Sequence, residues 1–86
     1  MELDTLRNEI DDIDAGIIAL FEKRMDICAK IGALKRVNNI PVLDSAREKA
    51  KLDSVAALSR DDMKNYTVCL FQKLFELSRD YQENIK

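Results

Sequence analysis

The feature that most constrains the fold is an apolar pattern over the first 37 residues. Apolar side chains recur there at alternating intervals of three and four, which is the heptad register of a packed α-helix. They are Leu3, Leu6, Ile10, Ile13, Ile17, Leu20, Ile27, Ile31 and Leu34. Arg24 occupies the a position between Leu20 and Ile27, where an apolar residue is expected. No proline interrupts the pattern, which predicts one helix from about Leu3 to Val37.

The chain then carries signals for a helix end and a helix start. Asn38 and Asn39 suit a helix C-terminus, and Pro41 lacks the N–H that would continue the helix. Ser45 and Glu48 stand three residues apart, in the pattern of a capping box. This pattern predicts a second helix that starts near Asp44 or Ser45, with Ser45 as its N-cap.

The rest of the chain completes an all-helical prediction. The second helix is expected to end near Leu58, and a third begins between Ser59 and Asp62. The apolar stripe of the third helix is Met63, Tyr66, Leu70, Leu74, Leu77 and Tyr81. There is no strand signal, and 86 residues suit one small domain. The sequence therefore predicts an all-α single domain over residues 1–86, with one very long helix and two shorter ones.

The length of the first helix creates a packing problem. A helix of 35 residues is about 52 Å long, whereas a compact chain of this size has a radius of gyration of about 12 Å. Two shorter helices cannot cover so long a stripe, and a second copy is the simplest partner. We therefore expect an intertwined helical homodimer with antiparallel long helices. The alternative is a monomer whose first helix folds back near Gly16.

Composition excludes several classes of protein. The net charge of −2 gives no sign of nucleic-acid binding, and no apolar run is long enough to span a membrane. The acidic N-terminus is unlike a signal peptide, which predicts a cytoplasmic protein. Cys28 and Cys69 are predicted to be buried free thiols, with a disulfide or redox pair as the alternative. The absence of His removes the commonest general base.

Cationic side chains along the first helix predict an anion site. Arg24 and Lys35 are 11 residues apart, close to three turns, so they share a face about 16 Å apart along the axis. Two long side chains on one face can grip a small anion between them. Arg7 is about 25 Å from Arg24 along the same helix, and only an antiparallel partner would bring it to that anion.

Each of these residues also has an ordinary structural interpretation. A polar residue at an a position, such as Arg24, often sets register or oligomeric state. Arg7 and Lys35 taken alone fit solvated flanking charges, and Glu48 taken alone fits a helix cap. Ser78 and Gln82 share a helix face at i, i+4, a pattern typical of solvated residues. Only their combination points to a binding site.

The chain resembles the all-helical class of chorismate mutase over nearly all of residues 3 to 82. Its first segment, LDTLRNEIDDIDAGIIALFEKRMDICAKIGALK, is similar to that family's first helix. NNIPVLDSAREK resembles the family's loop and the start of its second helix, and LFQKLFELSRDYQ resembles its third helix. The three motifs in this order and at these separations make the resemblance specific.

The resemblance implies an intertwined dimer with two equivalent active sites. Each site would combine residues of one chain with Arg7 of the other; the residues implied are Arg24, Lys35, Asp44, Arg47, Glu48, Ser78 and Gln82. The implied reaction is the Claisen rearrangement of chorismate to prephenate in phenylalanine and tyrosine biosynthesis. It needs no cofactor, no metal and no covalent intermediate, so the site would supply positioning and charge.

The resemblance also implies how these residues divide the work. Arg7, Arg24 and Arg47 would hold the two carboxylates of chorismate, and Ser78 would fix one of them. The other residues would face the ether oxygen and the ring hydroxyl.

Lys35 and Gln82 would donate hydrogen bonds to the ether oxygen as negative charge grows on it. Glu48 would accept from the ring hydroxyl, or donate near the ether if protonated. Asp44 would contact the hydroxyl region partly through its backbone. With Arg24, the residues Lys35, Gln82 and Glu48 are the predicted catalytic groups.

Three other interpretations fit parts of the sequence. An isochorismate-pyruvate lyase shares the scaffold and the cationic site. A non-catalytic helical dimerisation module would keep the dimer without ligand specificity. A plain antiparallel coiled coil explains the heptads, but it does not explain Arg24, Lys35 and Gln82 together.

Overall fold

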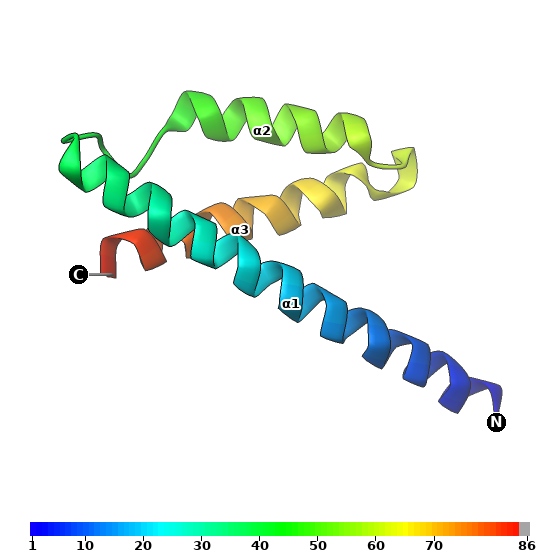
Figure 1. Ribbon diagram of the computed structural model, residues 1–86. Coiled ribbons are helices and arrows are strands. Elements are labelled where there is room, and N and C mark those ends of the chain that lie inside the picture. The colour runs from blue at the N-terminus through cyan, green and yellow to red at the C-terminus, as the bar shows by residue number, and fades with distance from the viewer. Residues whose placement is uncertain (85–86) are drawn as a thin grey trace.

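The computed structural model describes residues 1–84, which fold into three α-helices. Helix α1 spans Glu2–Val37, α2 spans Ser45–Leu58 and α3 spans Lys64–Asn84, with the short 3₁₀ turn η1 at Asp61–Met63 before α3. No strand occurs within residues 1–84. The prediction of one very long helix and two shorter ones is confirmed (Figure 1).

Helix α1 is unbroken and dominates the shape of the molecule. It passes through Gly16 without interruption, so the alternative of a first helix that folds back near Gly16 is wrong. The principal extents are 56 × 29 × 15 Å and the radius of gyration is 16.0 Å, well above the value of about 12 Å for a compact chain of this length. The N-terminal half of α1 projects away from α2 and α3 (Figure 1).

The end of α1 is a Schellman motif. The backbone N–H of Ile40 donates to the carbonyl of Lys35 at 2.8 Å, and that of Asn39 donates to the carbonyl of Arg36 at 3.3 Å. Asn39 has φ 56°, a left-handed conformation that asparagine tolerates better than most residues. Together with Pro41, this turn reverses the chain and returns the linker toward the end of α1.

Helix α2 starts where it was predicted, near Asp44 or Ser45, but its N-cap differs from the prediction. Asp44 is the N-cap, and its side chain accepts a hydrogen bond from the backbone N–H of Arg47 at 3.0 Å. Ser45 is the first helical residue, so its assignment as N-cap is wrong. The physical reason is that Asp44, one residue earlier, offers a carboxylate, which both accepts the hydrogen bond and complements the helix dipole. Glu48 is therefore not part of a capping box.

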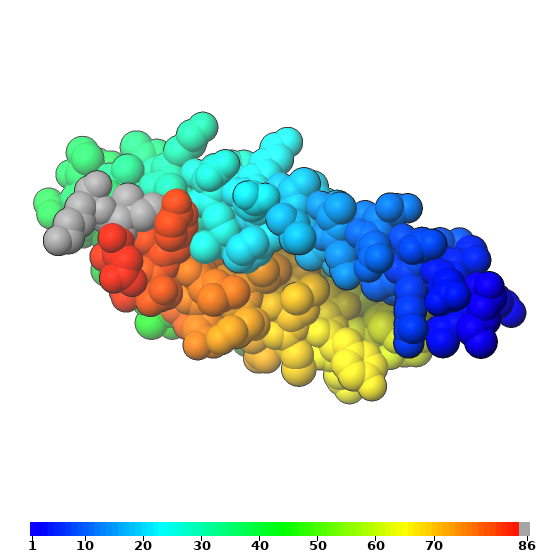
Figure 2. Space-filling view, turned by 90° about the horizontal axis from the view of Figure 1, so that it is seen from below, coloured from blue at the N-terminus to red at the C-terminus, as the bar shows by residue number. Residues whose placement is uncertain are grey.

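Helix α3 lies between the other two helices and packs against both. Among the described residues no Cα atom of α1 comes within 8 Å of one in α2. Helix α3 approaches α1 closely at Gly32, where an added Cβ would lie 2.9 Å from Cγ of Gln82. Figure 2 shows α1 running along the molecule with α3 against it.

Few side chains are shielded from solvent. In residues 1–84 the buried side chains are Cys28, Val55, Phe75, Ser78 and Gln82. All of the first 20 residues are exposed. No helix in the described part of the chain is both long and apolar enough to cross a lipid bilayer.

The two thiols have different environments. Both are free, and the prediction of a buried thiol is confirmed for Cys28 but wrong for Cys69, which is exposed. Cys28 lies where α1 meets α3, whereas Cys69 lies on a face of α3 that neither α1 nor α2 covers.

Candidate active site

A cavity of about 420 Å³ lies over α3, between the C-terminal half of α1 and the first turns of α2. Its lining comprises Arg24, Cys28, Ile31, Lys35, Val42, Asp44, Arg47, Glu48, Lys51, Phe75, Ser78, Arg79 and Gln82. Four of the five buried side chains are in this lining. The side chains best shielded from solvent therefore line this cavity and do not form a separate apolar core.

Arg24 is held on the α1 side by contacts to α3. Its Nη1 donates to the hydroxyl of Ser78 at 2.7 Å, and its guanidinium lies 5.8 Å from the ring centroid of Phe75. The Ser78 hydroxyl in turn donates to the carbonyl of Leu74 at 2.7 Å. The apolar stripe thus breaks at Arg24 because α3 provides a hydroxyl and an aromatic face there.

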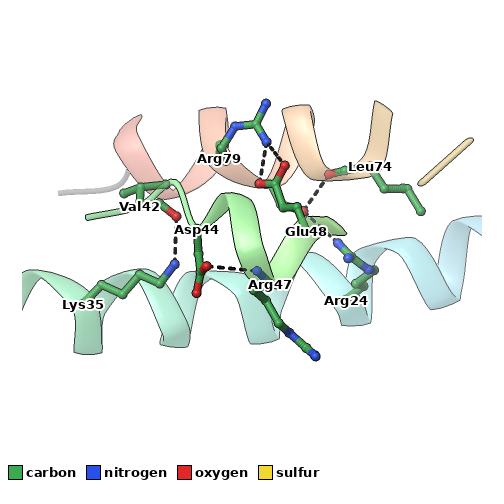
Figure 3. Close-up of polar contacts among 9 residues, drawn as sticks. Arg24, Lys35, Val42, Asp44, Arg47, Glu48, Leu74 and Arg79 are labelled. Atoms are coloured by element: carbon green, nitrogen blue, oxygen red, sulfur yellow. Dashed lines mark hydrogen bonds and ion pairs between the residues drawn. The ribbon is translucent and has the colours of Figure 1, made fainter. Parts of the chain in front are cut away.

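Lys35 reaches across the turn after α1. Its Nζ donates to the carbonyl of Val42 at 2.8 Å (Figure 3). The Schellman motif brings this carbonyl within reach. An ammonium group has three donors, so further hydrogens remain for a ligand.

Gln82 is the buried amide of the site, with 7% of its surface exposed. Its Nε2 donates to the carbonyl of Cys28 at 3.0 Å, which fixes one of its two N–H groups. The absence of a side chain at Gly32 lets Gln82 lie directly against α1. The amide is therefore placed by both helices.

The α2 side of the cavity carries both signs of charge. Arg47 is exposed and lines the cavity, and the carboxylate of Asp44 caps the helix. Both carboxylate oxygens of Glu48 accept from Nη1 of Arg79 on α3 at 2.5 Å (Figure 3). This ion pair connects α2 to α3 across one wall of the cavity.

Sequence reasoning missed two cations of the cavity, Lys51 and Arg79. The signal for both was helical periodicity. Lys51 is one turn beyond Arg47, and Arg79 directly follows Ser78 and precedes Gln82 by three positions. Their spacing from the predicted site residues could therefore have identified both cations.

Seven of the eight predicted site residues line this single cavity: Arg24, Lys35, Asp44, Arg47, Glu48, Ser78 and Gln82. Arg7 does not. It is exposed on the projecting half of α1, 17 residues before Arg24 and so about 25 Å away along the axis. Its predicted contribution from a second chain stays a prediction.

The charges of the lining favour a small anion. Of its five cations, only Arg79 forms an ion pair with a carboxylate of residues 1–84. The remaining cations are Arg24, Lys35, Arg47 and Lys51. Buried or half-buried cations without counter-charge are costly, so a ligand with carboxylates would complete the site. The fold and cavity therefore indicate a class of protein, an all-helical protein whose cavity suits a small organic anion.

Comparison with known proteins specifies the family. Residues 6–83 match the profile of chorismate mutase type II, and the chain belongs to that family. A bifunctional chorismate mutase/prephenate dehydratase of Buchnera aphidicola subsp. Schizaphis graminum is 35% identical over 79 residues, covering 90% of this chain and 20% of the relative. An intracellular chorismate mutase of Mycobacterium bovis is 35% identical over 60 residues, covering 70% of this chain and 57% of the relative.

A third relative has a different named substrate. It is a 4-amino-4-deoxychorismate mutase of Streptomyces pristinaespiralis, 38% identical over 45 residues, covering 52% of this chain and 35% of the relative. The chain therefore spans less than two thirds of the length of each of these three proteins. No solved structure matches the chain significantly.

Proposed function

We propose that the protein is a chorismate mutase, an isomerase that rearranges chorismate to prephenate in the biosynthesis of phenylalanine and tyrosine. The observation that carries the proposal is the group of four cations around the cavity that have no carboxylate partner in residues 1–84. Chorismate is a dianion with two carboxylates. In a member of the chorismate mutase type II family, such a cavity suits this substrate.

The reaction breaks the ether C–O bond while a C–C bond forms in one concerted step. It requires no nucleophile, so the protein contributes orientation and electrostatic stabilisation. Arg24 and Arg47 hold the substrate carboxylates, assisted by the hydroxyl of Ser78 and by Arg7 of the partner subunit. Bidentate guanidinium contacts fix the compact conformer in which the two reacting carbons meet.

Lys35 and Gln82 act at the ether oxygen, where negative charge develops in the transition state. Each already donates one hydrogen bond to a backbone carbonyl, Lys35 to Val42 and Gln82 to Cys28. These bonds fix the position of each nitrogen before substrate arrives. A donor placed in advance costs no reorganisation during the reaction, and removing one such donor typically raises a barrier by about 2.7–4 kcal/mol.

Glu48 accepts a hydrogen bond from the ring hydroxyl. Its pairing with Arg79 supports the role of acceptor over that of a protonated donor near the ether. Asp44 adds backbone contacts at the same end of the substrate. The substrate named for the Streptomyces pristinaespiralis relative carries an amine in place of this hydroxyl, so Glu48 faces the group at which the two compounds differ.

The proposed active form is an intertwined homodimer. The described chain exposes 6946 Å², whereas a compact monomer of this length exposes roughly 5,200 Å². The chain therefore exposes about 1,700 Å² more than a compact monomer would. Burial of this excess on two chains suits an obligate interface, which buries about 2,000–5,000 Å² in total.

The apolar surface on α1 and α3 supports the same assembly. A groove of about 490 Å³ lies between these helices and is lined mainly by Ile17, Leu20, Phe21, Leu70, Phe71 and Leu74. Ile17 and Leu70 are each 58% exposed. An antiparallel partner helix filling this groove would also carry Arg7 of the partner subunit toward the cavity.

The test is to mix the purified protein with chorismate, follow its loss and identify the product by chromatography. Prephenate formation is the expected result. No turnover by a folded protein would refute the proposal. Reaction of isochorismate instead would indicate an isochorismate-pyruvate lyase, and reaction of neither compound would indicate a non-catalytic helical dimerisation module.

A further inference from the structure

The ion pair between Arg79 and Glu48 joins α3 to α2 at the wall of the cavity. Glu48 lies on α2, and Arg79 lies on α3, next to Ser78. The side chains of Arg79 and Glu48 are 31% and 26% exposed. Both line the cavity and both are partly exposed, so the pair faces the cavity on one side and solvent on the other.

Arg79 changes what Glu48 offers to a ligand. A lone carboxylate beside a cavity attracts any cationic group, such as an ammonium ion. Here one guanidinium nitrogen contacts both carboxylate oxygens, which cancels most of that charge. Each oxygen keeps a lone pair, so Glu48 remains an acceptor for a neutral hydroxyl.

We propose that Arg79 is a specificity-determining residue that acts through Glu48. By neutralising and fixing this carboxylate, it makes the subsite select a ring hydroxyl and reject a ring amine. The inference rests on the proposed function, because it takes Glu48 to face the ring hydroxyl of chorismate. It assigns to this chain chorismate in preference to 4-amino-4-deoxychorismate.

The physical basis is like-charge repulsion. An aliphatic amine is an ammonium ion at neutral pH, whereas a hydroxyl is neutral. The ammonium would meet the guanidinium of Arg79, which lies directly against Glu48 in the same lining. Charges separated by a few ångströms at a half-exposed site interact strongly enough to alter selectivity by about tenfold or more.

The experiment compares the two substrates in the wild-type protein and in Arg79→Gln. The quantity measured is the ratio of kcat/KM for chorismate to kcat/KM for 4-amino-4-deoxychorismate. Because both values come from one preparation, partial unfolding of a variant cancels from the ratio. We expect Arg79→Gln to lower this ratio by about tenfold, which corresponds to about 1.4 kcal/mol.

Lys51→Gln is the matched control. It removes the same charge from the same cavity, but Lys51 forms no ion pair with Glu48. We expect its ratio to stay within about threefold of the wild-type value. An equal fall in both variants would assign selectivity to the general charge of the cavity and would overturn the role of Arg79.

The outcomes separate this inference from the proposed function. If the wild-type protein does not rearrange chorismate, the proposed function fails. If it does, an unchanged ratio in Arg79→Gln overturns the inference alone. Where turnover of the amine is undetectable, its inhibition constant against chorismate replaces kcat/KM, and an unchanged inhibition constant in Arg79→Gln counts equally against the inference.

Discussion

The two halves of α1 carry the same heptad pattern but have opposite surroundings. From Arg24 onward the helix packs on α3, and its side chains help to line a cavity in which Cys28 is buried. In the first 20 residues every side chain is exposed, although Ile10, Ile13 and Ile17 are as apolar as anything that follows. One periodic pattern therefore serves two purposes. The C-terminal half builds a site within the chain, and the N-terminal half has no partner within residues 1–84.

A heptad pattern predicts that one face of a helix is buried, but it does not predict which element covers that face. In the cavity half, Arg24 stands at an apolar position of the pattern and donates a hydrogen bond to the hydroxyl of Ser78 on α3. In the projecting half, an apolar surface remains exposed, which is typical of an interaction site.

The largest effect is expected from Ile13→Asp in the projecting half. If the stripe pairs with a second chain, this change places two uncompensated carboxylates in an apolar interface, each costing on the order of 3–5 kcal/mol. We expect the dimer to dissociate in sedimentation velocity and the activity to disappear. Ala15→Asp adds the same charge on the opposite face of α1 and serves as control. Equal behaviour of the two variants would show that the stripe is not an interface.

In the cavity half, Lys35→Ala should remove most activity and leave the assembly intact. Losing one preorganised donor lowers kcat by about 100- to 1,000-fold. Lys30→Ala, an exposed position of the same helix outside the cavity, should change kcat by less than about threefold. Sedimentation and steady-state kinetics on the same samples check both statements. A variant with wild-type turnover would remove Lys35 from the proposed site.

Arg24→Ala extends this test to the residue that interrupts the stripe. Arg24 lines both the cavity and the apolar groove. We expect a loss of kcat/KM of at least about 100-fold with the dimer retained, because a carboxylate contact disappears. Lys23→Ala, on the exposed neighbouring position, is the control. Dissociation of the dimer in Arg24→Ala would instead favour a register-setting role.

Much of this organisation could be predicted from the sequence because it is local. The length of α1, its end at the asparagines and the range of α2 follow from spacing, Pro41 and helix-forming composition. Arg24 and Lys35 on α1, like Ser78 and Gln82 on α3, lie on one helix face because each pair is close to a whole number of turns apart. That seven predicted residues would share one site was implied by the family resemblance and not by spacing. The resemblance to a known family supplied the order of the helices around them.

What could not be predicted depends on contacts between helices. The pairing of Glu48 with Arg79 joins residues 31 positions apart, and no local pattern reports it. The exposure of Cys69 likewise depends on which face of α3 is covered. The N-cap was misplaced by one residue because Asp44 and Ser45 are both good caps, and only the backbone geometry decides between them.

The two glycines of α1 compare the two halves at a smaller scale. An added Cβ at Gly32 would lie 2.9 Å from Cγ of Gln82, whereas one at Gly16 meets nothing within 4 Å. Gly32→Ala should destabilise the fold by up to about 2 kcal/mol, since overpacking of about 1–3 kcal/mol exceeds the helix-propensity gain of about 1 kcal/mol. It should also lower kcat by displacing Gln82.

Gly16→Ala should raise stability by up to about 1 kcal/mol and leave kcat unchanged. Urea unfolding and kinetics of the two variants give the comparison. Destabilisation by Gly16→Ala would mean that a partner helix approaches this position closely. Unchanged kcat in Gly32→Ala would show that Gln82 is not held in place by the close contact of α3 with α1.

The smallest effect concerns the first residues of α2, at the edge of the cavity. Asp44→Ala removes the side chain that accepts from the N–H of Arg47, and loss of an N-cap costs about 1 kcal/mol. Ser45→Ala, one residue later, replaces the first helical residue with the best helix former and should change stability by less than about 0.5 kcal/mol. Urea unfolding distinguishes the two, and the reverse order of effects would restore Ser45 as the cap. Arg47 lies in the first turn of α2, so a loosened helix start should weaken its contact with a substrate carboxylate. The donors at the ether oxygen lie on other helices. Asp44→Ala should therefore raise KM for chorismate more than it lowers kcat.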